Sequence, residues 1–187
     1  FARELLQPIA HQVGWDPQPG EGHLQVLLRS TVLGHLGAFG DAETTEEAQE
    51  RFLNFLTEPS SLIPDLRGLV YGLSAQEGDS NTHDTLRRLA HEATLQEEKI
   101  RLLASLARFQ QRPILEKTLQ ISLSSEVRLQ DTVMLVSAVA GNIHDGTKLA
   151  WEYVKDNWVE FNRRYGSGGF AMMRLVDITG NFTTPEA

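Results

Sequence analysis

Only one short stretch of this sequence approaches a catalytic metal-binding motif. His91 and Glu92 begin the pattern H-E-x-x-H, in which two histidines four residues apart share a helix face beside a glutamate that acts as general base. The second histidine is missing, because position 95 is Leu95. One histidine and one glutamate do not make a catalytic metal site. The sequence therefore predicts no catalytic residue and no metal ligand in this chain.

Two other groups of residues contain side chains of the types that bind cations. Asp79, His83 and Asp84 lie together near a predicted helix start, where a solvated helix terminus is the favoured interpretation and coordination the alternative. His23 and His35 are twelve residues apart on one predicted helix, so they cannot chelate one ion. We interpret both as surface or packing histidines.

The glycine-rich segment 166–169 contains Ser167 and could cradle a phosphate through its backbone N–H groups. It follows a predicted helix, however, and does not lie cleanly between a strand and a helix as a nucleotide-binding loop does. The sequence also has no G-x-S-x-G nucleophile motif. We interpret the segment as a helix ending.

Two arginines follow or interrupt apolar stretches. Arg29 lies among leucines of one predicted helix, and Arg108 ends another apolar stripe. A buried arginine has a carboxylate partner or lines a cavity, whereas an exposed one packs only its aliphatic stem. The second interpretation is favoured for each, and the first stays open.

Composition excludes several classes of protein. The chain has 187 residues, 17 basic against 25 acidic side chains, a net charge of −8 and no cysteine. This balance argues against nucleic acid or an anionic membrane as a partner, because phosphate binding needs clustered positive charge. The longest uncharged apolar run, 132–143, is too short to span a bilayer. The absence of cysteine is compatible with a reducing compartment, and we expect a cytoplasmic location.

Helical periodicity recurs along the chain, and no convincing strand pattern interrupts it. Capping boxes at 44–47 and 94–97 predict two of the helix starts, with a threonine as N-cap in each. Trp158 is expected to be buried, because it shares a predicted face with Val154 and Phe161. The predicted helices are 1–13, 21–39, 44–56, 64–73, 82–93, 94–109, 113–119, 130–140, 147–165 and 170–178.

About ten helices joined by short loops, without a sheet, predict an all-α fold. Helix pairs of 30–45 residues favour an α–α superhelix of the HEAT or armadillo kind, and a compact bundle is the alternative. No linker suggests a boundary, so residues 1–187 are expected to form a single domain. The chain begins without Met and ends where Thr184 would cap a new helix, which we interpret as a fragment truncated at both ends.

Several motifs, in order along nearly the whole chain, resemble the puromycin-sensitive aminopeptidase family. The most specific is segment 13–23 (VGWDPQPGEGH), followed by Leu27-Leu28-Arg29. The others are 44–52 (TTEEAQERF), 96–99 (QEEK), 123–128 (LSSEVR) with Gln130-Asp131, 150–158 (AWEYVKDNW), and Arg164-Tyr165 with Gly168-Gly169-Phe170.

The resemblance implies that the chain is most of the HEAT-like C-terminal domain of a zinc aminopeptidase, which removes N-terminal residues from peptides. In that family this domain closes over the catalytic domain of the same chain and helps to form an internal peptide cavity. The zinc ligands and the general base lie upstream, so no catalytic or metal residue carries over and the fragment is expected to be inactive. Some members have an arginine matching Arg108 at the cavity wall, which makes Arg108 the candidate substrate-binding residue. A free-standing helical scaffold for a protein partner is the alternative.

Overall fold

The computed structural model describes residues 1–167 and 169–182. Within these ranges the chain forms eleven α-helices and two short 3₁₀ segments, and it contains no strand. The all-α prediction is confirmed. The chain divides into two compact units, residues 1–77 and 78–187, which are described separately. The predicted cap at Thr184 lies outside the described residues.

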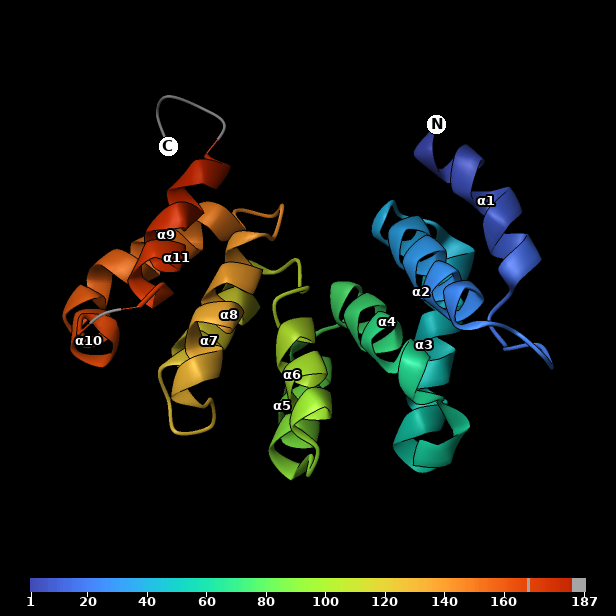
Figure 1. Cartoon of the computed structure of the whole chain (residues 1–187), viewed down its shortest axis with the longest axis horizontal. Coiled ribbons are helices and arrows are strands. Elements are labelled where there is room, and N and C mark those ends of the chain that lie inside the picture. Colours follow the sequence, from blue (N-terminus) through green and yellow to red (C-terminus); the bar gives the residue numbers. More distant parts are fainter. Residues whose placement is uncertain (168, 183–187) are drawn as a thin grey trace. The chain divides into compact units, whose positions relative to one another are not determined.

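The first unit contains four α-helices, coloured blue to green in Figure 1. Neighbouring helices contact each other in the order expected of an array: α1 packs on α2, α2 on α4, and α3 on α4. The elements are α1 (Ala2–Val13), α2 (His23–Ala38), α3 (Ala42–Thr57), the 3₁₀ segment η1 (Pro59–Ser61) and α4 (Pro64–Gln76).

Aromatic and aliphatic side chains form the core of this first unit. Tyr71 of α4 is fully buried and makes edge contacts with Phe52 and Phe55 of α3, with ring centroids 6.0 and 5.5 Å apart. Gly37 lets α2 approach α4 closely, because a Cβ there would lie 2.6 Å from the Leu73 side chain. Each fully buried aliphatic side chain contributes about 1.5–3 kcal/mol to folding.

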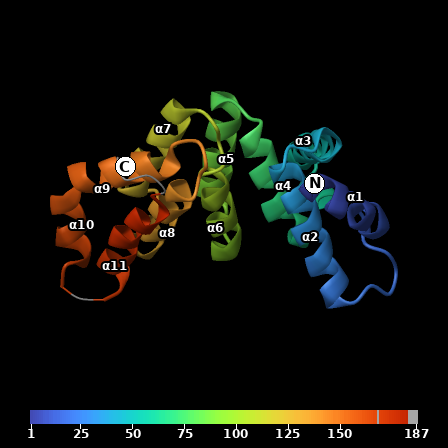
Figure 2. The same cartoon turned by 90° about the horizontal axis from the view of Figure 1, so that it is seen from above.

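The second unit contains seven α-helices, which are paired in sequence (Figure 2). Helix α5 packs on α6, α7 on α8, and α8 on α9 and α11. The elements are α5 (Ser80–Glu92), α6 (Gln96–Ser105), α7 (Arg112–Ser122), α8 (Leu129–Ala140), α9 (Gly146–Asp156), α10 (Trp158–Tyr165), α11 (Ala171–Val176) and the 3₁₀ segment η2 (Asp177–Asn181).

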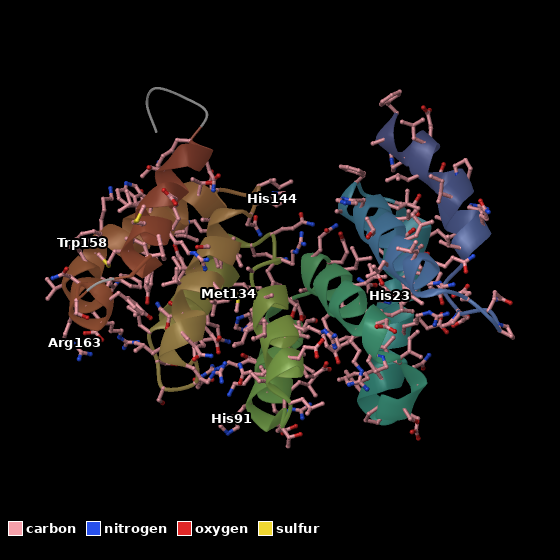
Figure 3. All side chains as sticks on the ribbon, viewed as in Figure 1. His23, His91, Met134, His144, Trp158 and Arg163 are labelled. Atoms are coloured by element: carbon pink, nitrogen blue, oxygen red, sulfur yellow. The ribbon has the colours of Figure 1, made fainter. Side chains whose placement is uncertain are left out.

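The helix predicted over 147–165 is wrong in one respect. It breaks at Asn157, which ends α9 and precedes α10. The break changes the helical phase, so Val154 and Phe161 are buried while Trp158, on the first turn of α10, remains 41% exposed (Figure 3). The predicted burial of Trp158 is therefore also wrong.

Both predicted capping boxes are misplaced. Helix α3 starts earlier, at Asp41, whose carboxylate accepts hydrogen bonds from the backbone N–H of Thr44 at 3.0 Å and from its hydroxyl at 2.7 Å. One carboxylate thus accepts two bonds and replaces Thr44 as the cap. Helix α6 follows Leu95, which has no capping side chain, so Thr94 is not its N-cap.

Candidate functional site

Arg108 lies on the surface of the second unit, just beyond the end of α6. Its backbone N–H donates to Ser105 O at 2.9 Å, which closes a tight turn after the helix. Its side chain is exposed, whereas the flanking Ala107 and Phe109 are buried. Of the two open interpretations, the exposed arginine is therefore correct for Arg108.

The backbone on both sides of Arg108 is held from other helices. Asn142, in the turn after α8, donates from its amide nitrogen to the carbonyls of Ala107 and Phe109, each at 2.8 Å. The hydroxyl of Thr118 on α7 lies 3.0 Å from Leu106 O. A guanidinium on so fixed a segment is well suited to bind a carboxylate through two parallel hydrogen bonds. Within the described part of the chain, no acidic side chain forms an ion pair with the Arg108 guanidinium.

Two pockets of the described structure lie away from Arg108. One, of about 240 Å³, is bordered by Ser137 of α8 and by Arg174 and Asp177 near the end of the second unit. The other, of about 190 Å³, lies in the first unit among Gln7, Trp15 and other residues of α1 to α3. Arg108 borders neither of these two pockets.

His83 is fully buried beside this segment, which the favoured interpretation of a solvated helix start did not predict. Its ring meets Phe109 edge-on at 5.4 Å, and its Nε2 lies 3.0 Å from the hydroxyl oxygen of Thr118. That hydroxyl also lies near the carbonyls of Leu106 and Ile114, at 3.0 and 3.1 Å, and can donate to only one of them at a time. The hydroxyl oxygen therefore accepts from His83, which places a proton on Nε2.

The other ring nitrogen of His83 has no hydrogen-bond partner within the described residues. Nδ1 lies 3.6 Å from the carboxylate of Asp84, which itself binds Lys117 of α7 at 2.5 Å. Burial, reinforced by the positive charge of Lys117, lowers the pKa of His83 below its ordinary value. Asp79 is the exposed N-cap of α5, so these residues form a capped helix start around a core histidine.

The histidines in the described part of the chain lie apart from one another and from any set of acidic side chains that could hold a metal ion. His91 is exposed near the end of α5, where the neighbouring Glu92 pairs with Arg88 at 2.9 Å (Figure 3). Of the two interpretations for His23 and His35, the surface one is correct, since both are exposed, and His35 stacks on Phe39. Within residues 1–167 and 169–182, no three histidine or acidic side chains are placed to hold a metal ion.

Arg29 in the first unit is completely buried, so for this arginine the favoured interpretation is wrong. Its guanidinium forms an ion pair with Glu21 and donates to the carbonyls of Val13 at 2.9 Å and Gly14 at 3.0 Å. Gly14 has φ = 58°, a conformation that favours glycine. Arg29 thus supplies the donors that the irregular segment between α1 and α2 cannot obtain from a helix.

A second arginine fastens the same loop from α3. Arg51 binds both carboxylate oxygens of Asp16, at 2.8 and 3.1 Å, and its guanidinium lies 5.2 Å from the centre of the Trp15 ring. The hydrogen bonds from Arg51 lower the pKa of Asp16. The segment most specific to the family resemblance is therefore a structural clamp rather than a catalytic motif.

The pocket in the first unit contains a buried carboxylate that is already satisfied. Asp41 accepts from Gln7 at 3.1 Å in addition to its two bonds from Thr44. Burial opposes ionisation of this carboxyl, but the hydrogen bonds from Thr44 and Gln7 outweigh it and lower the pKa of Asp41. The carboxylate serves to join α1 to the start of α3.

The glycine-rich segment after α10 shows no sign of a nucleotide-binding loop in the part that is described. Gly166 follows α10 directly and its N–H donates to Asn162 O at 2.7 Å, which ends the helix. Gly169 has φ = 99°, and Gly168 lies outside the described residues. None of the helices in the described ranges combines the length and apolar character needed to cross a bilayer.

Comparison with known protein families gives a match over the full length. Residues 1–187 match the family described as ERAP1-like C-terminal domain. Aminopeptidase M1 of Arabidopsis thaliana is 36% identical over 177 residues, which cover 92% of this chain and 20% of the relative. Glutamyl aminopeptidase of Bos taurus is 30% identical over 187 residues, covering 98% of this chain and 19% of the relative.

The similarity extends to a second plant protein. Aminopeptidase M1-A of Oryza sativa subsp. japonica is 36% identical over 163 residues, which cover 84% of this chain and 18% of the relative. The chain thus spans about one fifth of the length of these relatives.

Proposed function

Because this chain belongs to the ERAP1-like C-terminal domain family of M1 aminopeptidases, we propose that it is the non-catalytic C-terminal domain of a zinc-dependent aminopeptidase. The observation that supports this most strongly is the family match over all 187 residues, together with relatives that are named as aminopeptidases. Residues 1–187 would form a single helical domain of that enzyme, which we expect to be cytoplasmic.

In this proposal the chain has a structural and substrate-enclosing role. The described residues offer no ligand set for zinc, so the metal and the general base would be supplied by the catalytic domain of the same polypeptide. The helical domain would close over that domain and form part of an internal cavity for peptides. An isolated 187-residue chain is then expected to bind no stoichiometric zinc and to cleave no aminoacyl reporter, which metal analysis and a peptidase assay can check.

Arg108 is the residue through which this domain would contact a peptide. It is exposed on a backbone fixed by Asn142 and Thr118, so a change of its side chain leaves the core untouched. A guanidinium can bind the C-terminal carboxylate of a peptide. The peptide must be long enough to extend from the catalytic domain to Arg108. Loss of one charge-assisted contact costs about 1.5–3 kcal/mol, or about 10- to 100-fold in binding.

The test compares two substrates in the full-length enzyme. Arg108→Ala is expected to lower kcat/KM for a peptide of about ten residues by about tenfold or more, and to change kcat/KM for an aminoacyl reporter little, because the reporter is too short to reach this domain. Arg108→Lys, which keeps the charge, should lose less. Arg88→Ala, which changes an exposed arginine on α5, is the matched surface control.

Two outcomes would count against a substrate-binding role for Arg108. If both substrates are affected equally, the variant has disturbed folding or closure rather than a peptide contact. If neither is affected, Arg108 is a surface arginine. The peptidase assignment itself would fail if the full-length protein with bound zinc cleaved no N-terminal residue from any peptide.

A further inference from the structure

The pocket of the first unit, which we call the α1–α3 pocket, has an apolar floor. It has a volume of about 190 Å³ and is lined from the end of α1, the second half of α2 and the start of α3 (these helices are labelled in Figure 1). Ala10, Leu33 and Leu36 line it and belong to the buried core of this unit. The half-buried ring of Trp15 adds an aromatic wall. A ligand in this pocket would therefore contact aliphatic and aromatic surface.

The border of the α1–α3 pocket is acidic. Its ionisable side chains are Asp41 and Glu43, at the start of α3, and the exposed His11 of α1. Among the described residues that line the pocket there is no lysine and no arginine. An anion would face two carboxylates without a cation beside them, whereas a cation is attracted by both. The charge of the border thus selects a cationic ligand.

Asp41 can bind one donor more than its structural role requires. Burial opposes its ionisation, but the hydrogen bonds from Thr44 and Gln7 outweigh burial and lower its pKa, so the carboxylate is charged at neutral pH. A carboxylate offers about four acceptor positions. Thr44 uses two of them on Oδ1 and Gln7 uses one on Oδ2, at 3.1 Å. One position on Oδ2 is left for the charged group of a ligand.

Two arginines act near this border without lining the pocket. Arg3 influences Asp41 through its charge. Arg51 lies over the Trp15 ring, where two other carboxylates already pair with it. Within the described part of the chain, neither arginine forms an ion pair with the exposed Glu43. The border therefore keeps a negative charge that no side chain of the pocket itself offsets.

The volume of the α1–α3 pocket limits the size of its ligand. A cavity of about 150 Å³ that is lined by aliphatic and aromatic side chains can hold benzene. The α1–α3 pocket is slightly larger, at about 190 Å³, and so has room for one polar group beside a ring. Apolar body and charged group then each find a matching surface, because the floor is aliphatic and the border is acidic.

We propose that the α1–α3 pocket binds a small organic cation, whose ammonium or amidinium group pairs with Asp41 and Glu43 while its apolar body packs on Ala10, Leu33 and Leu36. The ligand class is a free molecule of about one ring or a short chain with one positive charge. The site is independent of the proposed peptidase function, because every residue that lines it lies between positions 7 and 44.

The test compares three probes of one shape on the full-length protein. Benzamidine, benzamide and benzoate share a ring and differ in charge, which is positive, neutral and negative. Calorimetry is carried out with an active-site inhibitor present, so that a cation bound in the catalytic domain does not contribute. We expect benzamidine to bind with a dissociation constant of about 1 mM, at least about tenfold tighter than the other two probes. Hydrogen exchange should slow at 7–15 and 41–44 when benzamidine is bound.

Single substitutions assign the binding to this pocket. Asp41→Asn keeps a residue that can cap α3 and should weaken benzamidine binding by about tenfold or more. Glu43→Gln, at an exposed carboxylate, should weaken it by about two- to fivefold. His11→Lys places a positive charge at the border and should also weaken it. Glu46→Gln removes an exposed carboxylate of the same helix that does not line the pocket, and it should leave binding unchanged.

Three results would overturn the proposal. The first is an absence of benzamidine binding at millimolar concentration, and the second is equal affinity for benzamide, which would show that charge is not recognised. The third is binding that Glu43→Gln and His11→Lys leave unchanged, which would place the cation elsewhere; these two exposed positions decide the test even if Asp41→Asn fails to fold. Peptidase activity is measured on the same samples, and its absence would count against the proposed function, not against cation binding.

Discussion

Residues 1–77 and residues 78–187 bury polar groups in different ways. The first unit buries a charge: Arg29 lies inside, pairs with Glu21 and supplies hydrogen bonds to an irregular loop. The second unit also buries a carboxylate, Asp131, which pairs with Arg128. Around Arg108, however, it uses neutral groups: the buried His83 binds Thr118, and the half-buried Asn142 binds the carbonyls on either side of Arg108.

The difference follows from what each unit must hold. The loop between α1 and α2 has carbonyls that no helix can satisfy, and a guanidinium offers several donors in one rigid group. In the second unit the groups to be joined are helix ends, for which one amide or hydroxyl suffices. The charged arrangement should therefore be the more costly to break, because removal of one partner leaves a buried charge uncompensated.

The largest effect is expected at Arg29. Arg29→Met removes the partner of Glu21 and the donors to Val13 and Gly14, and it should lower the free energy of unfolding of the first unit by about 3–5 kcal/mol. Native-state hydrogen exchange of α1 and α2 measures this. The double variant Arg29→Met/Glu21→Gln should recover part of the loss. Arg88→Ala should change stability by less than about 1 kcal/mol, since it breaks an exposed pair; a loss at Arg29 no larger than that would contradict the comparison.

An intermediate effect is expected at Asn142. Asn142→Ala leaves the carbonyls of Ala107 and Phe109 without their donor and should cost about 1–3 kcal/mol, measured by denaturant unfolding. Asn142→Asp should cost more, because a carboxylate would then face two carbonyl oxygens. If neither substitution lowered the free energy of unfolding, the hydrogen bonds of Asn142 would not support the segment that carries Arg108.

The smallest effect concerns pH. Burial, with the charge of Lys117, lowers the pKa of His83 in the folded state below its ordinary value of 6.5, and Asp84 and Arg87 are the other charged groups acting on the ring. The unfolded chain therefore binds a proton more readily than the native one. The contribution of neutral His83 to the free energy of unfolding is therefore fully present above about pH 6.5. It is lost as the pH falls below that value, by at most about 1.4 kcal/mol per pH unit.

His83→Gln removes this titration while its amide can still donate to Thr118. The variant should lose part of the decline in stability between pH 7 and pH 5.5 that unfolding curves show for the wild type. His91→Gln, which changes an exposed histidine at the other end of α5, is the control. A wild-type decline that persists unchanged in His83→Gln would assign the pH dependence to other groups.

Much of the secondary structure could be predicted from local patterns. The helix at 1–13 and the start at Pro64 are close to α1 and α4, because apolar spacing and proline at a first helical position act within a few residues. The predicted caps at 44–47 and 94–97 were misplaced. At the first, Asp41 is the N-cap, because its carboxylate accepts hydrogen bonds from both the backbone N–H and the hydroxyl of Thr44. The apolar residues of α2 differ in burial, since Val32 and Leu36 are buried while Leu24 and Leu28 are exposed, and periodicity alone does not separate them.

The sequence alone determined the all-α class, the absence of a complete metal-binding motif and, through its motifs, the family. These depend on residue type and on short spacing, which the chain carries regardless of its fold. Only the tertiary structure decided that Arg29 is buried while Arg108 is exposed, that His83 belongs to the core, and that Asn142 supports the segment on which Arg108 lies. Both arginines follow apolar residues, so local pattern cannot separate them. Arg29 is buried because Glu21 and the carbonyls of Val13 and Asp16, 8 to 16 residues earlier, surround its guanidinium. The side chain of Arg108 faces water instead.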